Sequence, residues 1–242
     1  MTSRLAKIIN LLDKGVSQTI IIFFAVVLFL CLYAIYDAIC IRNEMRVVSE
    51  ASSMVESVPD DARIEALKKT NDEVVAWVKI DNTNIDYPVM QANNNQYYLS
   101  HNFKKEYSTS GGIFADYRSD LLKDDYAVIY GHNMNGDSMF GEINKFEDGD
   151  FFASHEDGTL YLEKGEVHNF KVLGYAVVGN DNELVYDLDR VANDANEEVA
   201  KYLNEHALNR NNILGKYNAL VMLSTCYKHS SQRAVLLLGY NR

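Results

Sequence analysis

The segment ALVMLSTCYKHSSQRAVLLLGY (Ala219–Tyr240) contains two strongly apolar runs near the end of the chain. Each run, Ala219 to Leu223 and Ala234 to Tyr240, is typical of a buried β-strand, and ten mostly polar residues join them. Those ten residues include Cys226 and Arg233. Because functional residues often lie where a strand ends, the pattern predicts that Cys226 lies at the mouth of a groove and not in the core.

The rest of the chain continues the strand-rich pattern. Apolar or alternating runs between turn residues predict further strands. They span Val74–Ile80, Asn84–Met90, Gly111–Ala115, Tyr126–Tyr130, Thr159–Leu162 and Val167–Val178. Helical spacing of apolar residues predicts inserted helices near Ile64–Leu67 and Val199–His206. About eight strands with few helices predict a closed or nearly closed β-barrel, because closure removes exposed strand edges.

An uninterrupted apolar segment, TIIIFFAVVLFLCLYAIY (Thr19–Tyr36), lies near the N-terminus. Eighteen helical residues at ~1.5 Å each span about 27 Å, which is close to the hydrocarbon thickness of a bilayer. A cleaved signal peptide would have a shorter apolar region and small residues two apart, whereas Ala34 and Ala38 are four apart. The segment is therefore expected to be an uncleaved transmembrane anchor.

The charges before this segment predict its orientation. They are three basic residues and one acidic residue, namely Arg4, Lys7, Lys14 and Asp13. Basic residues favour the cytoplasmic side, so the N-terminus is expected inside and the C-terminal bulk outside. The expected organisation is a cytoplasmic N-terminus (1–18), an anchor (19–36), a stalk or linker (37–59) and one extracellular β-barrel domain (60–242).

Charge and cysteine usage restrict the possible functions. The formal net charge is −11 although the first eighteen residues are net basic, so the predicted ectodomain is acidic and a nucleic acid partner is not expected. Cys31 and Cys40 lie in or beside the apolar segment, which leaves Cys226 as the only ectodomain cysteine. No disulfide framework can form there, and Cys226 is either a nucleophile or an inert buried residue.

A nucleophilic cysteine needs a nearby base or cation, because a free thiol is mostly protonated at neutral pH. His132 follows the predicted strand Tyr126–Tyr130, after a Gly131 that permits a tight turn, so it can converge on Cys226. His229 is the rival base, or one half of a Cys-x-x-His metal pair. Structural zinc needs four ligands, so no metal is expected. The other histidines, expected at the surface or at caps, are His101, His155, His168 and His206.

Arg233 has two interpretations. It is either a solvated charge at a strand edge or a donor fork aimed at the oxyanion of a tetrahedral intermediate. Its position near Cys226 favours the second interpretation.

At these residues the chain resembles the sortases, the membrane-anchored cysteine transpeptidases of Gram-positive cell surfaces, and in particular their class B branch. Four segments carry the resemblance in order and spacing. They are WVKIDNTNIDYPVMQANNNQYYL (Trp77–Leu99), GGIFAD (Gly111–Asp116), YGHNMNGDSMF (Tyr130–Phe140) and LSTC (Leu223–Cys226) with Arg233 downstream.

The resemblance implies a sortase-like barrel with Cys226, His132 and Arg233 as the catalytic set. It implies a groove for the sorting peptide, with one wall formed by the insert from about Gly179 to Asn212. The groove residues that it implies are Asn95, Leu99, Ser224, Thr225 and, more weakly, Tyr186. The family often has an acidic residue after the cysteine, whereas Tyr227, Lys228 and His229 follow here, so the group that orients His132 stays open.

The implied reaction cleaves a C-terminal sorting motif of secreted proteins after its Thr, through a Cys226 thioester, and passes the acyl group to a peptidoglycan amine. It requires no cofactor and no metal; Glu147, Asp148 and Asp150 are expected to form a solvated acidic loop. The alternatives are a pilus-polymerising sortase that uses a pilin lysine, and a membrane-tethered binding ectodomain without catalysis. Papain-like peptidases and L,D-transpeptidases do not fit, because their cysteine and histidine occur in another order.

Overall fold

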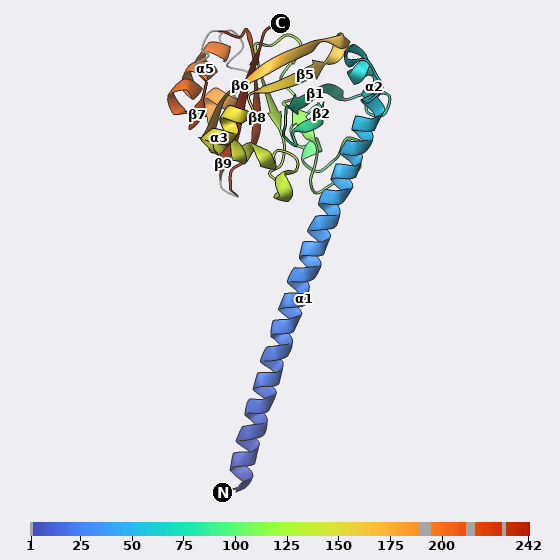
Figure 1. Cartoon of the computed structure of the whole chain (residues 1–242). Coiled ribbons are helices and arrows are strands. Elements are labelled where there is room, and N and C mark those ends of the chain that lie inside the picture. Colours follow the sequence, from blue (N-terminus) through green and yellow to red (C-terminus); the bar gives the residue numbers. More distant parts are fainter. Residues whose placement is uncertain (1, 189–194, 212–215, 229–230) are drawn as a thin grey trace. The chain divides into compact units, whose positions relative to one another are not determined.

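The computed structural model describes residues 2–188, 195–211, 216–228 and 231–242, and across these residues nine strands form one sheet. The strands are β1 (Val74–Ile80), β2 (Asp86–Met90), β3 (Ile113–Ala115), β4 (Tyr126–Tyr130), β5 (Asp157–Leu162), β6 (Val167–Gly179), β7 (Asn209–Arg210), β8 (Ala219–Cys226) and β9 (Gln232–Tyr240). They neighbour one another in the order β5-β1-β2-β3-β4-β8-β9-β6-β7, and β5 also pairs with β6. This second pairing closes eight strands into a barrel, with β7 added beside β6 (Figure 1). The predicted closed eight-stranded barrel is confirmed.

The helices lie before the barrel and in its connections. The α-helices are α1 (Thr2–Val55), α2 (Arg63–Lys68), α3 (Gly149–Ser154), α4 (Glu183–Tyr186) and α5 (Ala195–His206). Short 3₁₀ turns are η1 (Asp60–Ala62), η2 (Tyr97–Leu99), η3 (Asn135–Asp137), η4 (Gly141–Glu147) and η5 (Glu163–Gly165). Helices α4 and α5 both lie in the connection between β6 and β7, where the sequence predicted a helix-bearing insert.

Strand β8 is buried on both faces, which explains its uninterrupted apolar sequence. Val221 and Leu223 point into the barrel interior, whereas Leu220 and Met222 belong to a second apolar cluster on the outer face. Residues of α4 and α5, such as Leu203, cover that outer cluster. Since each fully buried aliphatic side chain contributes about 1.5–3 kcal/mol, the strands at the centre of this region are strongly held.

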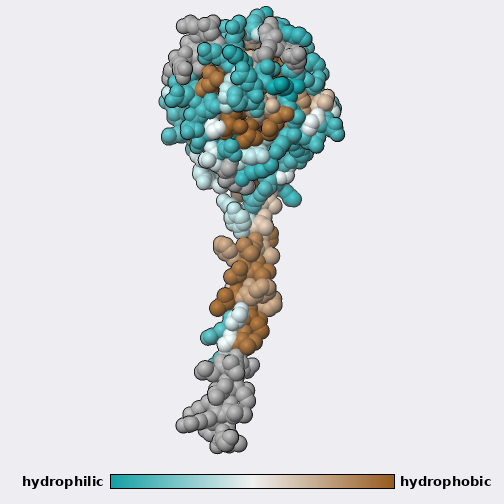
Figure 2. Space-filling model, turned by 90° about the vertical axis from the view of Figure 1, so that its left-hand side faces the viewer, coloured by the Kyte–Doolittle hydropathy of each residue, from teal (hydrophilic) through white to brown (hydrophobic). Residues whose placement is uncertain are grey.

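Helix α1 contains the predicted anchor. Within the described residues it is the one helix long and apolar enough to cross a membrane, over Lys14–Val55. The side chains from Thr19 to Ile35 are all exposed, and Figure 2 shows the apolar ones as a brown band.

The chain divides into two compact units, residues 1–42 and 43–242, so the last turns of α1 belong to the globular unit. Val47, Ala51 and Val55 recur every four residues along one face of the helix, and each is at most 2% exposed. They form one apolar cluster with Trp77 of β1 and Tyr98 of η2. The globular unit thus begins before Asp60, the boundary that the sequence suggested, and we propose that the folded domain starts near residue 43.

Candidate active site

Cys226 is the last residue of β8 and lies directly opposite Arg233 of β9. Directly opposed residues of an antiparallel pair project from the same face of the sheet. Arg233 Nη1 accordingly donates a hydrogen bond to Cys226 Sγ. Both residues are half-buried, and the sulfur has a cation beside it.

The segment with His132 leaves β4 beside the end of β8, because these two strands are parallel neighbours. The N–H of Gly131 donates to the carbonyl of Ser224 at 3.1 Å. On the other side of His132, Asn133 Nδ2 donates to the carbonyl of Cys226 at 2.8 Å. These two bonds hold the backbone around His132 next to that of Cys226, which is the convergence predicted from the sequence. Asn133 itself was not singled out by any sequence pattern.

Gly131 is closely packed against its neighbours. Its backbone does not have a left-handed φ angle. A Cβ at this position would lie 2.4 Å from Ile113 Cδ1 and 2.7 Å from the ring of Phe140. The small size of Gly131 lets the chain after β4 pass close to these neighbours.

The His132 ring is held by main chain. Nε2 lies 2.8 Å from the carbonyl oxygen of Leu99 in η2. Because a carbonyl oxygen only accepts, this bond requires a proton on Nε2 and leaves Nδ1 to take up or release one. Gly111, at φ +60°, packs directly against the backbone of η2, since a Cβ there would lie 2.8 Å from Leu99 O. The sequence left open what orients His132, and the Leu99 carbonyl is a contact that can do so.

Tyr186 of α4 joins the site from the insert. Its hydroxyl lies 2.9 Å from Ser224 Oγ. Burial raises the pKa of Tyr186 to about 12, although the Ser224 bond and the charge of Arg233 oppose the increase. Tyr186 is therefore a neutral hydroxyl at physiological pH, able to donate as well as accept. Two of the predicted groove residues, Tyr186 and Ser224, thus contact each other, and Ser224 lies two residues before Cys226 in β8.

The remaining predicted groove residues differ in exposure. Leu99 is 44% exposed beside His132. Asn95 is half-buried and already paired, because its Nδ2 donates to Asp116 Oδ2 at 2.7 Å and its Oδ1 accepts from the N–H of Tyr117 at 3.0 Å. Thr225 is 1% exposed and alternates onto the barrel interior, away from Cys226. The structure therefore does not bring the Thr225 side chain to the others.

The other histidines make local contacts, as expected. The carbonyls of Tyr97, Phe151 and Tyr202 lie 2.8 Å from the Nδ1 atoms of His101, His155 and His206, and His168 contacts Glu166. His229, the rival base, lies outside the described residues.

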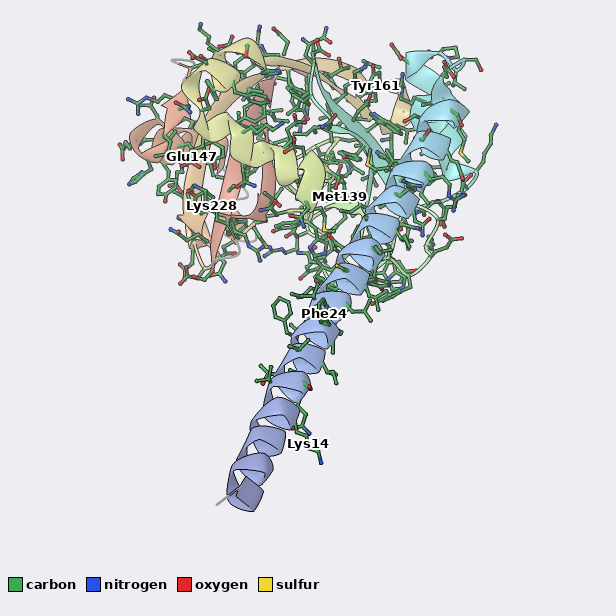
Figure 3. All side chains as sticks on the ribbon, turned by 60° about the horizontal axis from the view of Figure 1, so that its bottom comes forward. Lys14, Phe24, Met139, Glu147, Tyr161 and Lys228 are labelled. Atoms are coloured by element: carbon green, nitrogen blue, oxygen red, sulfur yellow. The ribbon has the colours of Figure 1, made fainter. Side chains whose placement is uncertain are left out.

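The predicted acidic loop, with Glu147, Asp148 and Asp150, lies where η4 meets α3. Asp148 caps α3 by accepting from the N–H groups of Asp150 and Phe151. Glu147 accepts from the hydroxyl of Tyr227 at 3.2 Å and pairs with Lys228 at 3.0 Å (Figure 3). Among the described residues no cluster of three metal-ligating side chains occurs. The three carboxylates are exposed, as the sequence suggested, and Glu147 also contacts the residues just after Cys226, which the sequence did not indicate.

Residues 78–237 match the family model of the sortase domain. The chain belongs to the sortase family. Sortase B of Listeria monocytogenes is 32% identical over 191 residues, which cover 77% of this chain and 76% of that protein. A mutant form of Clostridium perfringens sortase B superposes with a TM-score of 0.70 at 28% identity, covering 82% of this chain and 99% of that one. A class B sortase of Streptococcus pyogenes involved in pilus biogenesis gives 0.66 at 27% identity, covering 75% and 99%.

These relatives are class B sortases, so the resemblance read from the sequence is confirmed. Sortases are cysteine transpeptidases that act on sorting-motif peptides and cell-wall amines. In the globular unit of this chain, the one cysteine, Cys226, has Arg233 opposite it on β9, and His132 follows the adjacent parallel strand β4.

Proposed function

We propose that this chain is a membrane-anchored class B sortase that cleaves a C-terminal sorting motif of secreted proteins after its Thr and transfers the acyl group to a peptidoglycan amine. The pairing of Cys226 with Arg233 supports the proposal most strongly, because it places a guanidinium against the only cysteine of the globular unit. Cys226, His132 and Arg233 are the proposed catalytic residues.

In the first half-reaction, Cys226 Sγ, as a thiolate beside an imidazolium His132, attacks the carbonyl carbon of the Thr residue in the sorting motif. Arg233 donates to the developing oxyanion, where a fixed cation is worth most in a partly desolvated site. The C–N bond then breaks, and His132 as an imidazolium donates a proton to the departing amine. A thioester with Cys226 remains, and the C-terminal fragment leaves.

In the second half-reaction, a cell-wall amine attacks the thioester carbon. His132 takes the proton that the amine loses, the C–S bond breaks, and the sulfur leaves as a thiolate. A new amide joins the secreted protein to the wall. All atoms and protons balance with these three side chains, so the reaction requires neither a metal nor an organic cofactor.

For the groove, we propose that Leu99 supplies an exposed apolar contact and that Tyr186 and Ser224 supply hydroxyls beside Cys226. We propose that Asn95, in the loop before η2, also lines the groove. Thr225, buried beneath Cys226, shapes the strand without touching the peptide through its side chain.

For localisation, we propose that residues 19–36 cross the cell membrane once, with residues 1–18 in the cytoplasm and the catalytic domain outside. The basic residues before the span support this orientation. In this arrangement the anchor holds the site near newly exported clients.

The test uses the full chain in detergent micelles with a panel of sorting-type pentapeptides, each with and without an added amine. An oligoglycine amine represents the wall acceptor, and a lysine-containing peptide represents a pilin. We expect cleavage after Thr, with the amide product formed faster from oligoglycine than from the lysine peptide. A reversed acceptor preference would favour the pilus-polymerising function.

Failure to cleave any peptide, together with a Cys226 thiol that resists alkylation until the protein is denatured, would refute the transpeptidase function. That result would favour a membrane-tethered binding ectodomain.

A further inference from the structure

Asp116 is a fully buried carboxylate that the proposed mechanism does not use. It follows β3, ends the GGIFAD segment and has 0% exposure. Arg118 holds it with a fork: Nε donates to Oδ1 at 2.9 Å and Nη2 to Oδ2 at 3.0 Å. Asn95 Nδ2 and the Tyr130 hydroxyl also donate to Oδ2, at 2.7 and 3.1 Å. Every one of these contacts comes from a segment that borders the site.

The charge state of this group follows from its surroundings. Burial raises the pKa of the Asp116 carboxyl, but the bonds from Arg118 and Asn95 outweigh burial and hold that pKa below its ordinary value. Asp116 is thus an anion at neutral pH. A buried ion pair seldom adds net stability relative to apolar packing, so the directed contacts are its more distinctive property.

Each partner of Asp116 leads to a different part of the site. Asn95 lies in the loop before η2, whose Leu99 carbonyl contacts His132. Tyr130 ends β4. Arg118 Nη2 also donates to the carbonyl of Tyr186, at 2.8 Å.

Through Tyr186 the connection continues to the strand of the nucleophile, because the Tyr186 hydroxyl contacts Ser224 of β8. One buried carboxylate and its arginine therefore join the Asn95 loop, the end of β4 and helix α4.

We propose that Asp116 and Arg118 are positioning residues that hold the Asn95 loop and helix α4 at the separation needed to bind the sorting peptide. This inference rests on the proposed function of the site. It assigns Asp116 to recognition of the peptide and not to the reactivity of the thiol, since its described contacts reach the groove residues and not Cys226 or Arg233.

The first test is Asp116→Asn in the full chain, assayed for peptide cleavage and for alkylation of Cys226 by iodoacetamide across pH. Loss of one charge-assisted anchor is expected to raise KM for the peptide about tenfold while kcat changes less than about threefold. The alkylation rate and its pH profile are expected to match the wild type, because iodoacetamide does not need the groove. A merely structural defect would change alkylation as well.

Asp120→Asn is the matched control. Asp120 lies in the same connection between β3 and β4 and also binds a cation and a main-chain N–H, those of Lys123 and Leu122, but it is 40% exposed. This variant is expected to keep the wild-type KM.

Arg118→Lys is a second variant, which decides the question if Asp116→Asn does not fold. Its ammonium keeps the buried charge balanced but lacks the fork that reaches both carboxylate oxygens and the Tyr186 carbonyl. We expect a KM between those of the wild type and Asp116→Asn, with the unfolding midpoint measured to confirm folding.

Three outcomes would overturn the inference. A wild-type KM in folded Asp116→Asn or folded Arg118→Lys would show that the pair does not position the groove. A loss confined to kcat and alkylation would assign the pair to the thiol chemistry. A wild-type chain that cleaves no peptide would overturn the proposed function and this inference together, whereas the first two outcomes leave the proposed function intact.

Discussion

The register of β8 against β9 places Cys226 opposite Arg233. Their contact therefore does not depend on the movement of a loop. Strand pairs Ser224–Val235 and Thr225–Ala234 precede the Cys226–Arg233 pair without a bulge. Since these four preceding residues are all buried, the sulfur and the guanidinium start from a fixed geometry. Electrostatic stabilisation is effective when its donors are arranged before the reaction begins.

Cys226→Ala and His132→Ala are each expected to abolish peptide cleavage and leave the unfolding midpoint nearly unchanged. Both side chains are half-buried at strand ends, so their removal deletes reactive groups and little core volume. Single-turnover assays with a fluorogenic sorting peptide measure the loss, and thermal unfolding measures the fold. Turnover near the wild-type level in either variant would refute these catalytic assignments.

Arg233→Lys is expected to lower kcat about a hundredfold with a smaller change in KM. Lysine keeps the charge, but it lacks the planar fork that can serve sulfur and oxyanion together. Steady-state kinetics with saturating amine separate the two constants. A near-normal kcat in this variant would instead support the interpretation of Arg233 as a solvated charge without a catalytic role.

The acid stability of the fold reports on Asp116. Its folded pKa lies below the ordinary value of 3.8, so its contribution to stability is present above about that pH and is lost as the pH falls through the lower, folded value. The unfolding midpoint of the wild type is expected to exceed that of Asp116→Asn at pH 7, with the gap shrinking below pH 3.8. Circular dichroism melts from pH 7 to pH 3 measure the gap. A gap that stays constant throughout would show that ionisation of Asp116 does not stabilise the fold.

At the scale of elements, local patterns predicted most strands, because apolar runs such as Tyr126–Tyr130 and Ala219–Leu223 need burial to be stable. They could not predict the parallel pairing of β4 with β8, since register depends on contacts distant in sequence. Strand β7 has two polar residues and no apolar pattern, so it was missed.

The same limit applies to the site. Cys226, His132 and Arg233 could be selected from the sequence because their chemistry is distinctive and each lies next to a predicted strand. Asp116 and Glu147 could not, because a carboxylate is usually solvated and nothing in the local sequence indicates its partners. From the sequence, the end of α1 resembles a stalk, because its buried apolar residues, Val47, Val48, Ala51 and Val55, are interspersed with polar ones.

Helix α1 gives a prediction about the domain boundary. A chain that starts at Asn43 is expected to fold, whereas one that starts at Asp60 loses the packing of Val47, Ala51 and Val55. Loss of these three buried side chains is worth about 3–6 kcal/mol, a large part of the stability of a typical domain. Because Tyr98 belongs to the same cluster and precedes Leu99, peptide cleavage is also expected to fall.

Urea unfolding and peptide cleavage, measured on both truncated chains, test this boundary. The chain that starts at Asn43 serves as the control for removal of the apolar span. Equal stability and activity of the two chains would place the boundary at Asp60, where the sequence suggested it.

At the scale of the whole molecule, an apolar span and an acidic globular unit have to be arranged across a membrane. The formal net charge of −11 combines +2 on the residues before the span with −13 on the residues after it. Basic residues near a span are retained on the cytoplasmic side, while a long C-terminal domain can be translocated regardless of its charge. The charge distribution is thus consistent with a site that faces the wall.

We therefore expect protease added to intact protoplasts to digest the globular unit of the full chain and to leave a short membrane-bound fragment that contains residues 1–18. A C-terminal epitope is expected to disappear, and an N-terminal epitope is expected to persist until the protoplasts are permeabilised. Replacing Arg4, Lys7 and Lys14 with glutamate is expected to reduce the externally digested fraction, because the retention signal is then lost. If the C-terminal epitope survives in intact protoplasts, the catalytic domain is cytoplasmic, where neither an exported sorting motif nor a wall amine could reach Cys226.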